Sequence, residues 1–268
     1  PYGLDCREQA PVWAMFVGAM ESRPWSLTSS GPLVLAVVAM LRLALAQAPT
    51  ELRQLSSPLA THVVAMDFPH EANCFTEGLF LNGTDLDVFE SCGLTGRSYI
   101  RRYNLKDGTT RQRGDVPSDI FGEGLVVLGP KLFLLTYQKR QVLEYDAVSL
   151  TMVKRHPFPY GEGWGLTTDG CDLLATTGSS FIYTLRLDAD GVLQLLRKVE
   201  VMDGSTVVRN LNELEYVTPK LWVNQWYTNT IWRVDPLTGK CELKLDIGSI
   251  YSWNGGATPN GIAYSSHF

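Results

Sequence analysis

Short runs of alternating hydrophobic and polar residues fill most of the chain after residue 50, and this period of two residues is typical of β-strands. The clearest runs are rich in β-branched and aromatic residues and lie at 132–137, 181–187, 221–224 and 231–234. Turn signals with glycine separate the runs, at Asp107-Gly108, Asp169-Gly170, Asp190-Gly191 and 235–239. No stretch after residue 50 keeps a helical period with caps at both ends. The pattern therefore predicts an all-β protein.

A short signal that opens a strand-like run recurs at intervals of about 40 to 50 residues. It is found as Glu77-Gly78-Leu79, Glu123-Gly124-Leu125, Trp164-Gly165-Leu166, Asn212-Glu213-Leu214 and, as a fifth echo, Asn260-Gly261-Ile262. A period of this size built from short strands predicts a β-propeller, in which stacked blades bury each other's faces. Because the inner strands of a propeller surround one axis, side chains at equivalent repeat positions are expected to converge there.

The fifth repeat begins close to residue 268 and has too few residues for a whole blade. We therefore expect the last blade to be truncated at the C-terminus, with one or two strands missing. Residues 60–70, which include Val63 and Val64, are predicted to supply one outer strand of this blade and to close the ring.

Residues 1–46 are predicted to form a non-globular leader. Within it, about residues 20–46 resemble a secretory signal peptide, with a positive region, an apolar core at 33–41 and a small-residue cleavage signal at the end. Arg42 interrupts the apolar run, which is then too short for a membrane span of about 20 residues, so we expect a signal peptide and no stable membrane anchor. Residues 47–268 would form a single propeller domain.

Composition describes an ordinary packed protein and excludes one class of partner. The chain is 45% hydrophobic and 19% charged, with a net charge of −5, so it has no electrostatic footprint for nucleic acid. Basic residues cluster at Arg97, Arg101, Arg102 and Lys106, and we interpret them as a solvated strand edge. We expect a monomer.

Two features agree with passage through the secretory pathway or an extracellular location. Asn82-Gly83-Thr84 fits the acceptor pattern for N-glycosylation, and its Asn-Gly pair is typical of an exposed hairpin turn. Without the leader, four cysteines remain, at positions 74, 92, 171 and 241. They can form two disulfides in an oxidising compartment, but their spacing does not fix the pairing.

The strand-opening motifs occur in a characteristic order. They are Phe75-Thr-Glu-Gly-Leu79, Glu90-Ser-Cys-Gly-Leu94, Phe121-Gly-Glu-Gly-Leu125, Glu162-Gly-Trp-Gly-Leu-Thr-Thr-Asp-Gly170, Leu211-Asn-Glu-Leu-Glu215, Val223-Asn-Gln-Trp226 and Asn260-Gly-Ile-Ala263. Together they resemble the plant-type and bacterial glutaminyl-peptide cyclotransferases over about residues 60–264. The resemblance implies a five-bladed β-propeller and an acyltransferase that acts on peptides or proteins with an N-terminal glutamine.

The implied reaction is cyclisation of N-terminal glutamine to pyroglutamate. The α-amine attacks the side-chain Cδ, and ammonia leaves from the tetrahedral intermediate. The amine must lose a proton and the leaving nitrogen must gain one, which a single carboxyl group can do for about 10² to 10⁴-fold in rate. The family's general acid and base aligns with Glu123, and burial near aromatic rings is expected to raise its pKa. The alternative is a glutamate that only satisfies backbone amides at the blade ends.

Other residues match the substrate pocket implied by the resemblance. Asn212 is expected to donate to the developing oxyanion, as a second catalytic residue, and Trp164 and Trp226 to hold the flat glutamine amide. Glu213 is predicted either to bind the substrate's ammonium group or to cap neighbouring backbone, and both alternatives stay open. The remaining predicted substrate-binding residues are Phe75, Glu77, Phe121 and Tyr137.

Some positions depart from the family's pattern. Glu77 stands where the family usually has Gln, which brings a second acid to the site, and Tyr137 stands where it has Trp. The Thr-Gly-Lys segment followed by Trp-Pro, which carries a pocket lysine, does not occur within the 268 residues. Thr238-Gly239-Lys240 follows Asp235-Pro236 and is predicted to be an outer hairpin turn instead.

Metal and cofactor chemistry finds little support in the sequence. The histidines lack metal-like spacing and are interpreted as surface or turn residues, at His62, His70, His156 and His267. The reaction needs no cofactor, and no metal site is predicted. The departures from the family's pattern at Glu77, at Tyr137 and in the Thr-Gly-Lys segment leave a second hypothesis from another class of protein. It is a non-catalytic secreted propeller that binds peptide or glycan in its axial cavity.

Overall fold

The computed structural model describes residues 14–21, 33–37, 56–60, 62–82, 86–250 and 257–265. Every regular element within these ranges is a β-strand, so the predicted all-β class is confirmed. The described residues include no helix with the length and apolar character needed to cross a membrane.

Four sheets each contain four antiparallel strands that follow one another along the chain. The first contains β5 (Thr76–Asn82), β6 (Asp87–Cys92), β7 (Tyr99–Asn104) and β8 (Thr110–Asp115). The second contains β9 (Gly122–Leu128), β10 (Lys131–Thr136), β11 (Gln141–Asp146) and β12 (Met152–Pro157). The third contains β13 (Leu166–Thr168), β14 (Leu173–Ala175), β15 (Phe181–Leu187) and β16 (Leu193–Glu200). The fourth contains β19 (Leu211–Val217), β20 (Lys220–Gln225), β21 (Thr230–Val234) and β22 (Cys241–Asp246).

The strands predicted from the hydrophobic pattern are confirmed. The run 181–187 has the bounds of β15, and 132–137, 221–224 and 231–234 lie on β10, β20 and β21 within one residue at each end. Three of the short strands were not predicted. β3 (Leu59–Ala60) extends the fourth sheet by pairing in parallel with β22, and β17 (Met202–Asp203) forms a small hairpin with β18 (Thr206–Val207).

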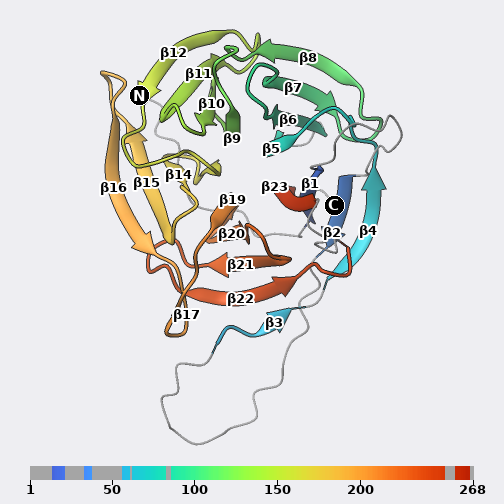
Figure 1. Cartoon of the computed structure of the whole chain (residues 1–268), viewed down its shortest axis with the longest axis vertical. Coiled ribbons are helices and arrows are strands. Elements are labelled where there is room, and N and C mark those ends of the chain that lie inside the picture. The colour runs from blue at the N-terminus through green and yellow to red at the C-terminus, as the bar shows by residue number, and fades with distance from the viewer. Residues whose placement is uncertain are drawn as a thin grey trace, which may run out of the picture.

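The sheets are arranged as the blades of a propeller. Figure 1 looks along the axis and shows β5, β9, β19 and β23 (Ala257–Ser265) near the centre, with β8, β12, β16 and β22 at the rim. Contacts between neighbouring inner strands form a closed circuit, from β5 to β9, β13, β19, β23 and back to β5. The predicted convergence of the repeat openings on one axis therefore agrees with the strand arrangement.

A further sheet closes the circuit, with the strand order β23-β1-β2-β4. β4 (Val63–Phe68) is its outermost strand, which confirms that residues 60–70 supply an outer strand of this sheet. β1 (Ala14–Glu21) and β2 (Leu33–Val37) fill the two positions between β4 and β23. The expectation that one or two strands are missing is therefore wrong, because strands from the N-terminal part of the chain complete this sheet.

β1 and β2 belong to the range 1–46 that the sequence predicts to be a leader outside the fold. In the structure their backbones pair with β23 and β4, so these two segments differ from a wholly non-globular leader. Removal of a signal peptide and the domain boundary at residue 47 stay predictions.

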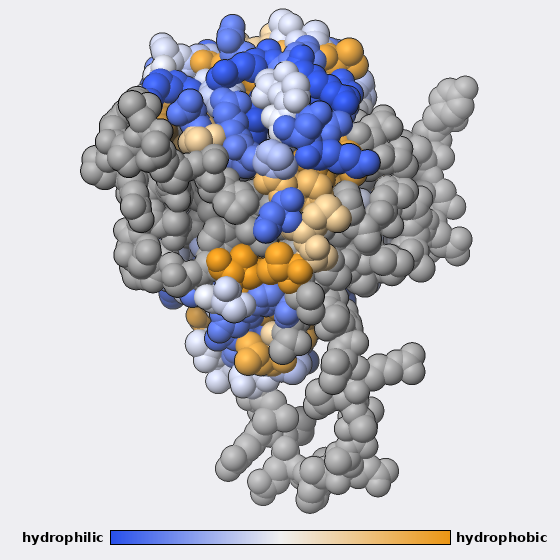
Figure 2. Space-filling model, turned by 90° about the vertical axis from the view of Figure 1, so that its right-hand side faces the viewer, coloured by the Kyte–Doolittle hydropathy of each residue, from blue (hydrophilic) through white to orange (hydrophobic). Residues whose placement is uncertain are grey.

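Figure 2 shows the face on which β4 lies, where an apolar band separates more polar regions. Val64 and Met66 of this strand are exposed.

The cores lie between the sheets and use both faces of inner strands such as β10. On β10, Phe133 and Leu135 pack toward the third sheet with Leu166 and Leu173. Leu132 and Leu134 point to the opposite face and pack with the side chains of another cluster, including Phe89 of the first sheet. Because both faces are buried, the sequence of β10 is a continuous apolar run, as expected for a strand inside a stack of sheets.

Candidate active site

The first residues of the five strand-opening signals come together at the propeller axis. They are Glu77 of β5, Glu123 of β9, Trp164 just before β13, Asn212 of β19 and Asn260 of β23. The two carboxyls and two amides are at most 8% exposed, although all four groups are polar. Such groups are normally found buried only where they are hydrogen-bonded.

A chain of hydrogen bonds links four of these polar side chains. Asn212 Nδ2 donates to Asn260 Oδ1 at 3.0 Å, and Asn260 Nδ2 donates to Glu77 Oε2 at 2.6 Å. A further side-chain hydrogen bond joins Glu77 to Glu123. The residues come from four different sheets, so the chain of bonds runs from one inner strand to the next.

The backbones that carry the two glutamates are also held together. Gly78 N donates to Ser91 Oγ at 2.8 Å, and the same hydroxyl donates to the main-chain oxygen of Glu123. A Cβ atom on Gly78 would collide with the backbone of Gly124 on the next inner strand. Glycine is therefore required at this point because it lets β5 and β9 approach closely enough for their carboxyls to meet.

The two carboxyls have strongly shifted pKa values. Burial raises the pKa of Glu77 to about 8, against the lowering effect of the hydrogen bonds to Glu123 and Asn260. Burial also raises the pKa of Glu123 well above its usual range, and the charge of Glu77 raises it further. Among the described residues, neither carboxyl forms an ion pair with Lys, Arg or His. A pair of this kind can hold a proton at neutral pH and exchange it.

Glu213 occupies the repeat position that is glycine in the other four signals. Its Oε1 accepts a hydrogen bond from Leu166 N at 3.1 Å, and the backbone of Leu79 also hydrogen-bonds to the carboxyl. A Cβ on Gly124 would strike this same oxygen, so the neighbouring glycine leaves the room that the Glu213 side chain fills. The contacts are those of the backbone-capping alternative. Binding of a substrate ammonium group by Glu213 stays a prediction.

Aromatic side chains line the space beside Glu123. The Phe121 ring lies edge-on to Phe75 at 6.3 Å and to Tyr137 at 5.9 Å between centroids. Tyr137 lies near Glu123 and Tyr227, and it forms a side-chain hydrogen bond with Glu162. Burial and these acidic neighbours raise the pKa of the Tyr137 hydroxyl. The predicted residues Phe75, Phe121 and Tyr137 therefore form one continuous group.

The two predicted tryptophans form the other part of this wall. Trp164 and Trp226 meet edge to face at 4.9 Å between centroids, and Trp226 stacks on Tyr227 at 3.8 Å. The Trp164 indole also lies against Gly178, where a Cβ would collide with the ring. Trp164 Nε1 is buried, and no group of the described residues is its hydrogen-bond partner. A buried donor that nothing satisfies is available to an acceptor on a bound molecule.

Two residues at the site were missed as functional residues. Asn260 was recognised as part of the fifth repeat but was given no role, although its repeat position is equivalent to that of Glu123. Glu162 precedes the Gly163-Trp164 pair, and Gly163 N donates to the main-chain oxygens of Thr136 and Tyr137. The repeat alignment could have found Asn260, whereas Glu162 reaches the site only through this tertiary contact.

The segment Thr238-Gly239-Lys240 lies away from the axis, as predicted. It forms the turn between β21 and β22, the two strands farthest from the axis among β19 to β22. Gly239 N donates to Asp235 O at 2.8 Å, and Gly239 has a φ of +74°, which favours glycine. For the predicted glycosylation site, the side chain of Asn82 and residues 83–85 lie outside the described residues, so that site stays a prediction.

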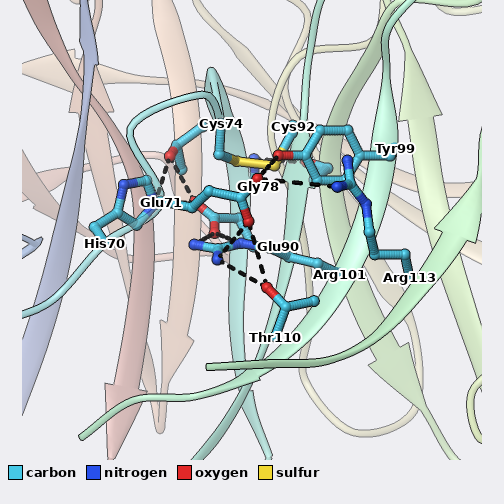
Figure 3. The surroundings of a disulfide bond; sticks show 12 residues. His70, Glu71, Cys74, Gly78, Glu90, Cys92, Tyr99, Arg101, Thr110 and Arg113 are labelled. Atoms are coloured by element: carbon cyan, nitrogen blue, oxygen red, sulfur yellow. Dashed lines mark hydrogen bonds and ion pairs between the residues drawn. A yellow bond between two sulfur atoms is a disulfide. The ribbon is translucent and has the colours of Figure 1, made fainter. Parts of the chain in front are cut away.

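A second buried polar cluster lies beside the site in the first sheet (Figure 3). Arg101 is fully buried, and its guanidinium donates to Glu90 Oε2 at 2.7 Å through Nε. His70 Nε2 lies 2.7 Å from Glu90 Oε1, and Thr76 Oγ1 donates to the same oxygen at 2.5 Å. The interpretation of Arg101 as a solvated edge residue is therefore wrong. Glu90 faces Arg101 across the β6–β7 pair, and the sequence alone does not show this contact.

Buried contacts in the first and second sheets correct two further interpretations. His70 takes part in the cluster around Glu90, and His156 is 1% exposed and lies 2.7 Å from Glu144 Oε2, so neither is a simple surface residue. Cys74 and Cys92 form a disulfide next to Glu90, which supplies a pairing that the sequence left open. Cys241 is a buried free thiol.

Comparison with known proteins gives consistent results. Residues 34–267 match the sequence model of a family described as glutamine cyclotransferase. A glutaminyl-peptide cyclotransferase from Arabidopsis thaliana is 35% identical over 209 residues, which are 76% of this chain and 64% of that protein. This chain thus spans slightly less than two thirds of the length of that curated relative.

Solved structures agree at the level of the fold. The crystal structure of a Myxococcus xanthus glutaminyl cyclase is similar with a TM-score of 0.66 and 25% identity, covering 76% of this chain and 86% of that one. A protein in the crystal structure of a nidogen–laminin complex is similar with a TM-score of 0.55 and 14% identity, covering 94% and 97% of the two chains. The second likeness concerns the fold alone.

Proposed function

This chain belongs to the glutamine cyclotransferase family, and we propose that it is a glutaminyl-peptide cyclotransferase. Its substrates would be peptides or proteins with an N-terminal glutamine, and its products pyroglutamate and ammonia. The observation that carries the proposal is the position of Glu123. This carboxyl is buried at the meeting point of the inner strands, has a raised pKa and lies beside a wall of aromatic rings.

Glu123 would move the proton that the reaction needs to relocate. As the substrate's α-amine bonds to the side-chain Cδ, the Glu123 carboxylate takes a proton from the amine. It then returns this proton to the side-chain nitrogen, and the bond from Cδ to that nitrogen breaks to release ammonia. The carbonyl re-forms in the lactam, and Glu123 ends as a carboxylate. A raised pKa suits this role because the group can both accept and donate a proton near neutral pH.

Hydrogen-bond donors near the reacting carbonyl would stabilise the negative oxygen of the intermediate. Trp164 Nε1 is a buried donor with no partner in the part of the chain that the structure describes, and Asn212 uses one N–H of its amide on Asn260 and keeps a second. Both groups are held in place by packing and hydrogen bonds before any substrate arrives. Such preorganised donors are usually a large part of catalysis in acyl transfer. The aromatic wall would exclude side chains bulkier than glutamine.

The remaining expectations about the protein are part of the same proposal. We propose that the sheet β23-β1-β2-β4 is the fifth blade of a five-bladed propeller, which the closed circuit of inner strands supports. A monomer that enters the secretory pathway without a stable membrane anchor, and that carries a glycan on Asn82, agrees with the sequence pattern.

A turnover assay tests the function. Purified chain is incubated with a peptide that begins with glutamine, and the ammonia released and the peptide mass are measured over time. The expected result is ammonia release above the spontaneous rate, with a mass loss equal to one ammonia per peptide. Two control peptides, one with an acetylated N-terminus and one that begins with asparagine, should not react. Absence of turnover with saturable binding of the glutamine peptide would support the non-catalytic propeller instead.

A further inference from the structure

Glu77 is a second carboxyl at the axis that the proton transfer described above does not use. It is 2% exposed, and its side chain is confined on several sides. Asn260 Nδ2 holds Oε2 at 2.6 Å, and Glu123 bonds to the carboxyl from β9. A Cβ on Gly93 would collide with Glu77 Cγ and with the Phe121 ring, so these groups are in close contact. The carboxyl thus has a fixed position next to Glu123.

We propose that Glu77 and Glu123 share one proton across their hydrogen bond, and that Glu77 acts as a positioning residue that stores this proton during turnover. The inference rests on the proposed function for its role in catalysis, but the shared proton itself is independent of any substrate. It assigns a specific purpose to an acid at a position where the resemblance leads one to expect Gln.

The contacts of the pair require a proton between the two groups. A hydrogen bond between two carboxyls forms only if one of them is protonated, because two carboxylates have no donor. Glu77 Oε1 is buried and has no hydrogen-bond partner among the described residues, so a proton held between this oxygen and the neighbouring Glu123 carboxyl would satisfy it. Two adjacent carboxylates in a buried site repel each other strongly, and no cation among the described residues forms an ion pair with them.

The groups around Glu77 and Glu123 also favour a single shared proton. Glu213 on β19 and Glu162 before β13 both add negative charge near Glu123. From β23, the facing group is the neutral amide of Asn260, whose orientation is fixed because its Oδ1 accepts from Asn212. Its Nδ2 therefore points to Glu77 Oε2 and stabilises a partial negative charge there. The arrangement leaves the proton on the side of Glu77 that faces Glu123.

A shared proton would help the cyclisation in both of its proton transfers. The free pair carries one proton and one negative charge. When Glu123 takes a proton from the attacking amine, the pair becomes neutral with two protons, and Glu77 retains the one it stores. When Glu123 gives a proton to the leaving nitrogen, the pair returns to one proton. No step leaves two adjacent carboxylates unprotonated in the buried site.

The variant Glu77→Gln tests the inference, because Gln keeps the shape and can still accept from Asn260 while it cannot store a proton. The first measurement is kcat with a glutamine-led peptide between about pH 5 and 10. In the unaltered protein, kcat should fall as the stored proton is lost near a pKa of about 8, roughly tenfold at one pH unit above it. In Glu77→Gln this fall should disappear, and the acidic limb should move to lower pH.

The second measurement needs no activity. Carbon-13 NMR of the protein labelled at glutamate Cδ should show a protonated carboxyl from the pair at pH 7, and in Glu77→Gln the Glu123 signal should titrate at a lower pH, because the charge of Glu77 no longer raises its pKa. Glu215→Gln is the matched control. Burial raises the pKa of Glu215 to about 7, but its contacts are Thr167 and the backbone of Tyr264, so its removal should leave the kcat profile unchanged.

The two measurements separate this inference from the proposed function. Normal turnover with identical pH profiles in the unaltered protein and Glu77→Gln would overturn the inference and leave the function standing. A fully ionised pair at pH 7 would overturn it as well. Absence of turnover in a protein whose pair holds one proton would reject the function but support the shared proton.

Discussion

Glu90 and Glu77 are neighbouring buried acids of one sheet with opposite electrostatic behaviour. They lie on the paired strands β6 and β5 and are 0% and 2% exposed. Burial raises the pKa of both groups. At Glu90, the interactions with His70 and Arg101 and a hydrogen bond from Thr76 outweigh burial and bring the pKa to about 2. At Glu77, where the partners are an amide and another acid, the pKa is about 8.

The comparison shows that burial alone does not decide what a carboxyl can do. Glu90 has a guanidinium partner at 2.6 Å, so its charge is fixed and its proton is not available near neutral pH. The axial acids have no cation partner within the described residues, so they retain a proton there. Glu90 and Arg101 stabilise the edge of the site, next to the Cys74–Cys92 disulfide, while the axial pair has the properties of a proton-exchange group.

Glu123→Gln should produce the largest effect on activity. The variant preserves the shape of the side chain and removes the proton shuttle, so kcat should fall by about 10² to 10⁴-fold. The free energy of unfolding should not decrease, because the change also removes a buried acid without a cation partner. Turnover assays and urea unfolding of the same preparations measure both quantities. Turnover equal to that of the unaltered protein would remove Glu123 from its assigned role.

Arg101→Met should produce the largest effect on stability. It leaves the Glu90 carboxylate buried with only His70 and Thr76, and breaking a buried pair in this way costs about 3–5 kcal/mol of unfolding free energy. Arg113→Met is the matched control, because Arg113 is half exposed and lies over the Tyr99 ring, where the loss should be below about 1 kcal/mol.

Urea unfolding of both variants measures the difference. If Arg101→Met does not fold, the double variant with Glu90→Gln should recover part of the stability, since it removes the uncompensated charge. Equal losses in Arg101→Met and Arg113→Met would show that the buried pair is not a special element of the sheet.

The pH dependence of the free energy of unfolding should have opposite signs for Glu90 and Glu77. This effect should be smaller than those of Glu123→Gln and Arg101→Met. The folded-state pKa of Glu90 is below its usual value of 4.5, so its contribution is present above pH 4.5 and is lost as the pH falls toward 2. The pKa of Glu77 is raised, so its contribution is present below pH 4.5 and is lost as the pH rises through about 8. Urea unfolding across this range should show a flatter acidic limb in Glu90→Gln and a flatter limb from 4.5 to 8 in Glu77→Gln. Unchanged slopes in both variants would contradict the assigned shifts.

The sequence predicted most of the fold because its signals are local. Alternating residues mark β15 and β20, and the recurring opening signal aligns Glu77 with Glu123 before any coordinates are known. The partners of the N-terminal strands could not be predicted in this way. β1 pairs with β23 across more than 200 residues of sequence, β2 pairs with β1 and β4, and an apolar run such as 33–41 is equally typical of a signal peptide.

The active site was predicted only in part, because the signals in the sequence are local. Repeat positions and motifs led to Glu123, Trp164 and Asn212, but they do not show which side chains are hydrogen-bonded to each other. The bond from Asn260 to Glu77 and the contact of Arg101 with Glu90 depend on the packing of one strand against another. Residue type alone made Arg101 look solvated, because most arginines lie at the surface.

The decisive experiment is a crystal structure of Glu123→Gln with a bound peptide that begins with glutamine. We expect the glutamine side chain to lie at the axis between the Trp164–Trp226 wall and Asn212, with its Cδ and the peptide's α-nitrogen both next to residue 123. A peptide bound away from the inner strands, or with its N-terminus pointing out of the aromatic wall, would contradict this expectation.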